Sequence, residues 1–139
     1  YYRDGKLMSD PSPGKAGSHG ARKPFVIENR VKNHPITKGL PDKWMHVTDE
    51  LYATLRGPGE NMTVLSTAYS DPNNKGTGRD EPVLMVLSFG RGRVFHTTLG
   101  HDVAAVSGPA FGVTLLRGTE WAATGKVRQK LPPDFPAAK

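Results

Sequence analysis

An apolar segment, a tight turn and a second β-rich segment together limit the folds that this chain can adopt. Residues 82–89 read PVLMVLSF, residues 90–92 read GRG, and residues 93–99 read RVFHTTL. Two such segments joined by a short Gly turn predict a β-hairpin over residues 82–99. Because the first segment is apolar at nearly every position, it also suits a strand covered on both faces, as in an α/β sheet.

Other segments predict the rest of the secondary structure. Residues 62–69 (MTVLSTAY) are rich in β-branched side chains and predict a strand, and shorter strands are expected at 25–31 and 44–48. Asp102 can cap a helix start, Pro109 suits a first helical turn, and Gly125 suits a helix end. Residues 4–24 and 70–80 hold Gly, Pro and polar residues without a period, so loops are expected there.

Length and composition favour one domain over residues 1–139, with a loop-rich segment at 1–24 and a Pro-rich tail at 126–139. The chain has 139 residues, and ~100–200 is usual for a domain. The absence of cysteine excludes a disulfide scaffold, a Cys-ligated zinc site and a thiol nucleophile. No apolar run reaches the ~18–20 residues that span a membrane, so no membrane partner is expected.

The net charge of +6 is concentrated near the N-terminus. Residues 1–43 carry nine Lys/Arg and four acidic residues, whereas the remaining residues carry ten and nine. The first segment contains no basic helix and no basic patch interleaved with aromatic residues. The pattern therefore favours a solvated basic segment, and no nucleic-acid partner is expected.

Two groups of polar residues are candidates for a functional site. His46, Asp49, Glu50 and Tyr52 lie close in sequence, and on a strand His46 and Glu50 would share a face and could hold one proton, one sugar hydroxyl or one metal ion. The alternative is a polar strand end at the surface. In the second group, Thr98, Gly100 and His101 lie where a strand enters a helix.

The position of the second group favours a ligand site. In open α/β sheets, ligands bind outside the carboxyl ends of the strands, so His101 would project into a cleft there. Free N–H groups at the helix start would favour an anionic ligand or an oxyanion. The alternative is a histidine that caps or packs locally.

A third group, Arg79 with Glu81, opens the apolar segment, and its acid is expected to be partly desolvated. Alternatively, these two residues pair at the surface. Among the other histidines, His96 is expected to be a satisfied interior residue, and His19 and His34 to lie in loops without ligand-spaced partners. Arg117 and Glu120, three residues apart, predict an ordinary helical ion pair.

Five stretches in this order resemble the ThuA-like (trehalose-utilisation) family. They are HPITKGLP at 34–41, HVTDELY at 46–52, EP at 81–82, GRGRVF at 90–95 with TLGH at 98–101, and RGTEWAATG at 117–125. The resemblance implies a flavodoxin-like, class I glutamine amidotransferase-like three-layer α/β sandwich. It also implies a link to the catabolism of disaccharides and their 3-keto derivatives. Glutaminase chemistry is excluded, because the chain has no cysteine nucleophile.

The positions that match the family's motifs are His46, Asp49, Glu50, Tyr52, Glu81, Gly100 and His101. We predict roles for most of these residues and for two others, Arg79 and Thr98. His101 is expected to act as general acid and base, with His46 and Glu50 positioning or deprotonating a hydroxyl next to a carbonyl. The expected contacts to sugar hydroxyls are Asp49, Tyr52, Arg79, Glu81 and Thr98. A divalent metal held by His46, Glu50 and His101 stays open as an alternative, and no other cofactor is expected. The expected activities are those of a keto-sugar isomerase, lyase or hydrolase; the alternative is a non-catalytic carbohydrate-binding or interaction module.

Family members carry further strand–helix units before the position of Tyr1. The chain is therefore expected to be the C-terminal part of a longer domain, without the first strands of its sheet. Its expected partners are a small-molecule sugar and, to cover the apolar sheet edge, the missing segment or a second copy. Because no signal peptide is recognisable, a cytoplasmic location is the default expectation.

Overall fold

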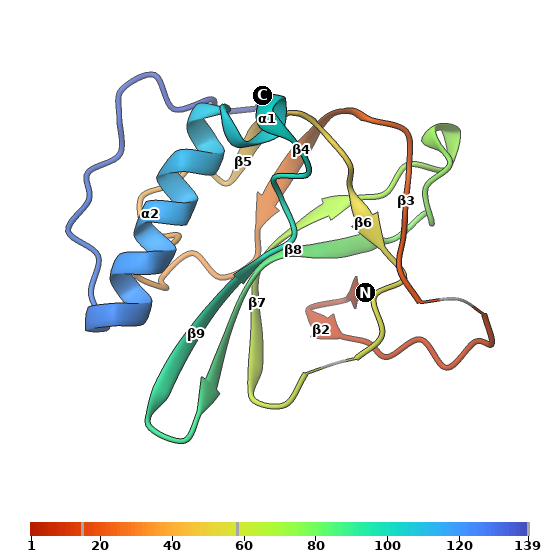
Figure 1. Ribbon diagram of the computed structural model, residues 1–139, viewed down its shortest axis with the longest axis horizontal. Helices are drawn as coiled ribbons and strands as arrows, with labels where there is room; N and C mark the ends of the chain where they lie inside the picture. The colour runs from red at the N-terminus through yellow and green to blue at the C-terminus, as the bar shows by residue number, and fades with distance from the viewer. Residues whose placement is uncertain (15, 58, 139) are drawn as a thin grey trace.

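The computed structural model describes residues 1–14, 16–57 and 59–138, which form an α/β structure with one long helix against a sheet (Figure 1). The first half contains β1 (Tyr2–Arg3), β2 (Lys6–Leu7), β3 (Ser18–His19), β4 (Lys23–Asn29), β5 (Lys43–Asp49) and β6 (Tyr52–Ala53). The second half contains β7 (Met62–Tyr69), the 3-10 helix η1 (Pro72–Asn74), β8 (Asp80–Phe89), β9 (Gly92–Thr97), α1 (Val103–Val106) and α2 (Pro109–Thr124).

The long strands and the helix ends were predicted correctly. β7 has the predicted bounds, and β8 and β9 form the predicted hairpin. The Asp102 side chain caps α1 by accepting a hydrogen bond from the Ala105 N–H, Pro109 begins α2, and Gly125 ends it at φ +75°. The loop predicted over 4–24 is wrong in part, since it contains the short strands β2 and β3 and the start of β4. β3 pairs with β6, which lies far along the chain and which a local pattern cannot indicate, whereas β2 pairs with the neighbouring β1 across a turn at Asp4 and Gly5.

The main sheet has seven strands in the order β2-β1-β8-β7-β4-β5, with β9 paired to β8. Every pairing between the described strands is antiparallel, as is that of the separate β3–β6 ribbon. A flavodoxin-like sheet is parallel, so the antiparallel direction of the described strands differs from the one that the resemblance implies. β8 is apolar along most of its length because it lies between β7 and β9 and is buried on both faces.

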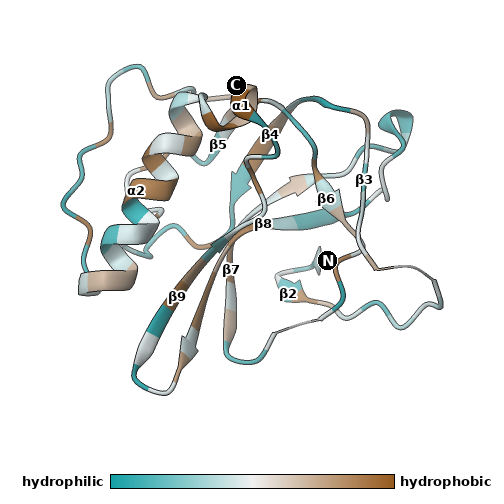
Figure 2. Cartoon of the chain, viewed as in Figure 1, coloured by the Kyte–Doolittle hydropathy of each residue, from teal (hydrophilic) through white to brown (hydrophobic). Residues whose placement is uncertain are grey.

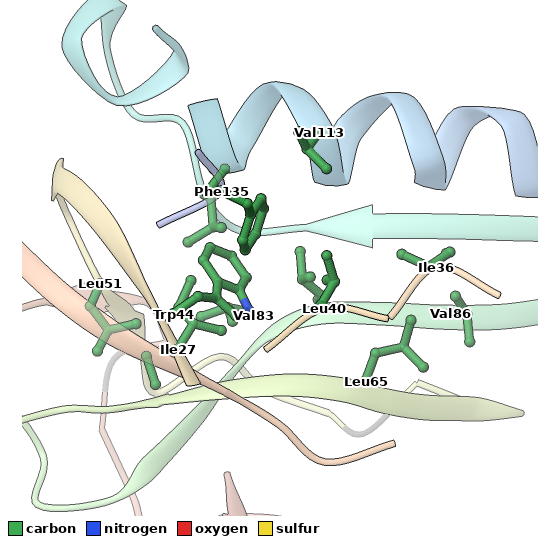
Figure 3. Packing of buried hydrophobic residues seen from close by; sticks show 14 residues of the cluster. Ile27, Ile36, Leu40, Trp44, Leu51, Leu65, Val83, Val86, Val113 and Phe135 are labelled. Carbon is green, nitrogen blue, oxygen red and sulfur yellow. The ribbon is translucent and has the colours of Figure 1, made fainter. Parts of the chain in front are cut away.

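The core lies between the sheet and α2. Cross-strand partners point to the same face, so Val86 and Phe95 both project toward α2. The Phe95 ring packs directly over Gly118 of the helix. Figure 2 shows the hydrophobic stretches of β8 and β9 where they pass near α2, in contrast to the hydrophilic loop around η1. Figure 3 shows the interior of this layer, with Trp44 and Phe135 side by side above Ile27.

The Pro-rich tail returns to the sheet and contributes to the core. Its Phe135 ring contacts Trp44 edge-on, with 5.6 Å between ring centroids. The Met45 N–H donates to the Pro136 carbonyl, and the Ala138 N–H donates to the Lys43 carbonyl. The tail thereby satisfies backbone groups at the edge of β5. Across the described part of the chain, none of the helices has both the length and the apolar character needed to cross a membrane.

We expect Gly118→Ala to destabilise the protein, because the added methyl group would collide with the Phe95 ring. Overpacking of this kind typically costs about 1–3 kcal/mol of unfolding free energy. Gly112→Ala in the same helix is the matched control, because nothing lies within 4 Å of its added Cβ. That change should raise stability by roughly 0.5–1 kcal/mol through helix propensity. Urea unfolding measures both; equal effects would contradict the described packing of α2 on β9.

Candidate functional site

A cavity of about 720 Å³ opens on the face of the sheet opposite α2. Met85 and His96, which are cross-strand partners on β8 and β9, project to this face and line the cavity floor. The walls come from the N-terminal segment, the stretch around β6 and the segment that follows β9; they include Leu7, Tyr52 and His101. A cavity of this size is within the ~300–1,000 Å³ typical of small-molecule sites.

A buried carboxylate, Asp49, holds the segment after β9 against the end of β5. Its Oδ2 accepts hydrogen bonds from Gly100 N at 2.7 Å and is 2.8 Å from His46 Nε2, while Oδ1 accepts from Glu50 N at 2.8 Å and His101 N at 3.1 Å. Gly100 has φ +99°, a conformation that favours glycine. A Cβ at this glycine would also collide with the Phe111 ring. The hydrogen bonds to Asp49 and the packing of Gly100 against Phe111 therefore fix the backbone position of His101.

Burial and hydrogen bonding have opposing effects on the pKa values of Asp49 and His46. Burial raises the pKa of Asp49, but the N–H donors of Gly100, Glu50 and His101, together with the His46 ring, outweigh it, so the pKa lies below its usual value of 3.8. Burial lowers the pKa of His46 below 6.5, and the Asp49 carboxylate offsets this only in part. His46 Nδ1 is buried and has no hydrogen-bond partner among the described residues. Both effects favour a neutral imidazole beside an ionised carboxylate.

Four polar side chains form a cluster that reaches the cavity through Tyr52 and His101. His101 Nδ1 lies 3.1 Å from Glu50 Oε2 and 3.0 Å from the Tyr52 hydroxyl. On the other side of the carboxylate, His19 Nε2 lies 3.7 Å from the same Oε2. Burial and the nearby Glu50 carboxylate raise the pKa of Tyr52 above 10, so its hydroxyl keeps its proton at neutral pH. This is a chain of groups that can relay or share a proton.

The structure brings together only part of the predicted residue set. Tyr52, Glu81, Thr98 and His101 line the cavity, and Glu50 contacts His101 from behind. His46 and Asp49 are fully buried and do not line the cavity. The strand ends at Asp49, so Glu50 does not continue the strand face of His46 as expected.

The third group of predicted residues is also divided. Arg79 forms an ion pair with Asp10 instead of Glu81. Glu81 accepts a hydrogen bond from the Thr77 hydroxyl at 2.7 Å and lines the cavity. Over residues 1–14, 16–57 and 59–138, the structure contains no cluster of three His, Asp or Glu side chains that could hold a metal ion.

Two expectations about histidines were wrong. His19 lacks sequence neighbours that could act with it, but the β3–β6 ribbon pairs it with Tyr52 and places its ring near Glu50. His96 is exposed on the cavity floor and is not an interior residue. No local signal could have identified His19, because its partner strand lies more than thirty residues away in the chain. The alternation of β9 about Phe95 could have placed His96 on the opposite face.

We expect Asp49→Asn to destabilise the protein by roughly 1–3 kcal/mol for each buried N–H group that loses its acceptor. The amide can accept through one oxygen only, so some of the N–H groups of Glu50, Gly100 and His101 would lose their acceptor. Asp71→Asn is the control, because Asp71 caps η1 at the surface and Asn caps equally well. Thermal and urea unfolding compare the two; a small loss at Asp49 would contradict its anchoring role.

We also expect the free energy of unfolding to fall as the pH drops from 7 to 5. The unfolded chain binds a proton at His46 near pH 6.5, whereas the folded protein resists it because burial lowers that pKa. His34 contributes in the same direction, since burial lowers its pKa too. Denaturant unfolding at both pH values should show a smaller loss in His46→Gln than in the native protein. An unchanged loss would show that His46 takes up its proton equally in both states.

Comparisons with known proteins identify a family and two solved structures that this chain resembles. The ThuA family, described as trehalose utilisation, matches residues 10–122. A ThuA-like protein from Parabacteroides merdae has a crystal structure that superimposes with a TM-score of 0.93 at 51% identity, over 99% of this chain and 51% of that one. A ThuA-like protein from Bacteroides uniformis superimposes with a TM-score of 0.59 at 18% identity, over 81% and 49% of the two chains, and shows likeness of fold.

The chain spans about half the length of the solved structures that it matches. The comparison with curated proteins gave no match. The family match covers most of the chain. It includes β4 to β9, all of α1, most of α2 and the residues around His101. The resemblance found in the sequence is thereby confirmed: this chain belongs to the ThuA family.

Proposed function

We propose that the cavity opposite α2 binds a disaccharide or keto-sugar and that His101 transfers a proton to and from it. The observation that carries the proposal is the contact between His101 Nδ1 and Glu50 Oε2 at 3.1 Å, at the wall of the cavity. A carboxylate accepts hydrogen bonds, so Nδ1 donates its proton in this contact and Nε2 keeps its lone pair. Among the described residues, none forms a hydrogen bond with Nε2.

This arrangement suits proton transfer at a carbon or hydroxyl next to a carbonyl. Nε2 removes the proton, and the positive charge that forms on the imidazole is stabilised by the Glu50 carboxylate. The same nitrogen then returns the proton to the intermediate, which balances the reaction. The Tyr52 hydroxyl, 3.0 Å from Nδ1, keeps the ring oriented between these steps.

The lining of the cavity fits a sugar. Thr98 and Glu81 supply a hydroxyl and a carboxylate that can bind sugar hydroxyls, while Leu7 and Met85 can contact the apolar C–H face of a ring. The match to trehalose utilisation supports a disaccharide as the substrate class. Because the chain spans about half of its solved relatives, the activity of the whole protein is part of this proposal.

His46 and Asp49 act on the substrate indirectly. They are buried behind the cavity, and Asp49 holds the backbone of Gly100 and His101. We therefore assign them a positioning role in place of the direct contacts expected from their sequence spacing. Arg79, which is paired with Asp10, is not assigned a substrate contact.

We expect His101→Gln to lower kcat on a 3-keto disaccharide by roughly 10²–10⁴-fold, the usual contribution of a general acid or base. Glutamine preserves hydrogen bonding, so the dissociation constant of the sugar should change far less than kcat. Product analysis with trehalose and its 3-keto derivative, together with calorimetry, measures the two quantities separately.

His34→Gln is the matched control, because His34 packs against Trp121 and does not line the cavity. It should keep native turnover once folding is verified by its melting temperature. Unchanged turnover in His101→Gln would remove His101 from the mechanism. Sugar binding by the native protein without any product would contradict the proton-transfer step and favour the carbohydrate-binding module.

A further inference from the structure

A second hollow lies on the side of the sheet that carries α2, between the C-terminal end of the helix, the turn at 34–40 and the returning tail. It measures about 620 Å³. Its charged lining residues are all basic; they are Lys38, Arg117, Lys126 and Arg128. The sugar cavity lies on the opposite face and shares none of these residues.

Arg117 is the unusual member of this lining. Its side chain is buried, with the residue only 5% exposed, and Nη2 donates to the carbonyls of Pro35 at 3.0 Å and Lys38 at 2.6 Å. Its Nε is buried without any hydrogen-bond partner among the described residues. A buried guanidinium normally has a carboxylate partner, because an unpaired buried charge is strongly destabilising.

The acid expected to neutralise Arg117 is engaged elsewhere. Glu120 was predicted to form an ion pair with it, but no such pair occurs among the described residues. Instead, Glu120 Oε2 accepts hydrogen bonds from the backbone N–H groups of Arg128 and Gln129. Burial therefore lowers the pKa of Arg117, and the charge of Glu120 offsets this only in part.

One contact removes an obstacle to an anion at this end of α2. The partial negative charge at a helix C-terminus would repel an anion. Here Arg93 covers it by donating to the carbonyls of Trp121 and Ala123.

We propose that this hollow binds a phosphate group, either inorganic phosphate or a phosphate monoester, with Arg117 as its central contact. Arg117 lines the hollow and would donate to the phosphate through its guanidinium group, as arginine commonly does with phosphate. Lys38 and Lys126, which also line the hollow, neutralise the remaining charge. The site thus lies apart from the sugar cavity and adds a second ligand class to this protein.

The test titrates the protein with inorganic phosphate and with glucose 6-phosphate, using glucose as the uncharged comparison. Calorimetry gives the affinities, and amide NMR shifts at Gly39 and Val127 locate the site. The double variant Lys38→Gln with Lys126→Gln should weaken phosphate binding about tenfold, equivalent to ~1.4 kcal/mol. Arg117→Lys should weaken it further. If that variant fails to fold, the double variant still decides the question.

The matched control is Lys6→Gln with Lys75→Gln, which removes the same charge from exposed lysines outside the hollow. Tighter binding of glucose 6-phosphate than of phosphate would support the site and identify a monoester as its ligand. Equal binding of the two would support a site for the phosphate group alone. Absence of shifts at Gly39 and Val127, or equal weakening in both double variants, would overturn the proposal.

Discussion

The buried carboxylate of Asp49 is the interaction on which the site depends. It accepts three backbone N–H groups and contacts the His46 ring, at the point where β5 ends and the segment after β9 passes. A buried charge is tolerated only when it is fully hydrogen-bonded. This requirement holds the backbone around Gly100 and His101 in place, and contacts with Glu50 and Tyr52 then orient the His101 ring.

The antiparallel sheet divides the molecule into two faces with different roles. On one face, Phe95 packs on α2, and the tail completes the core through Phe135 against Trp44. On the other face, the N-terminal segment, the stretch around β6 and the segment after β9 surround a cavity. Consecutive side chains along β9 point to opposite faces of the sheet. Phe95 therefore packs in the core, and His96 lies on the cavity floor.

In the basic hollow, the buried charge of Arg117 lacks the full set of partners that Asp49 has. Asp49 is buried with all its partners, whereas Arg117 is buried with an unpartnered Nε and without a carboxylate. The same physical rule applies to both residues: a buried charge needs either protein partners or a ligand. The contrast distinguishes a charge that organises the fold from one that awaits a bound group.

Sequence alone determined the elements whose signals are local. These are the β8–β9 hairpin, β7, the Asp102 cap and the ends of α2, together with the ThuA-like motifs. Tertiary structure alone decided that Glu50, His19 and Tyr52 gather around His101 and that Arg117 lacks its helical partner. The physical reason is distance along the chain. Local patterns report the period and the end of an element, whereas pairing between remote strands and the burial of charge depend on the whole fold.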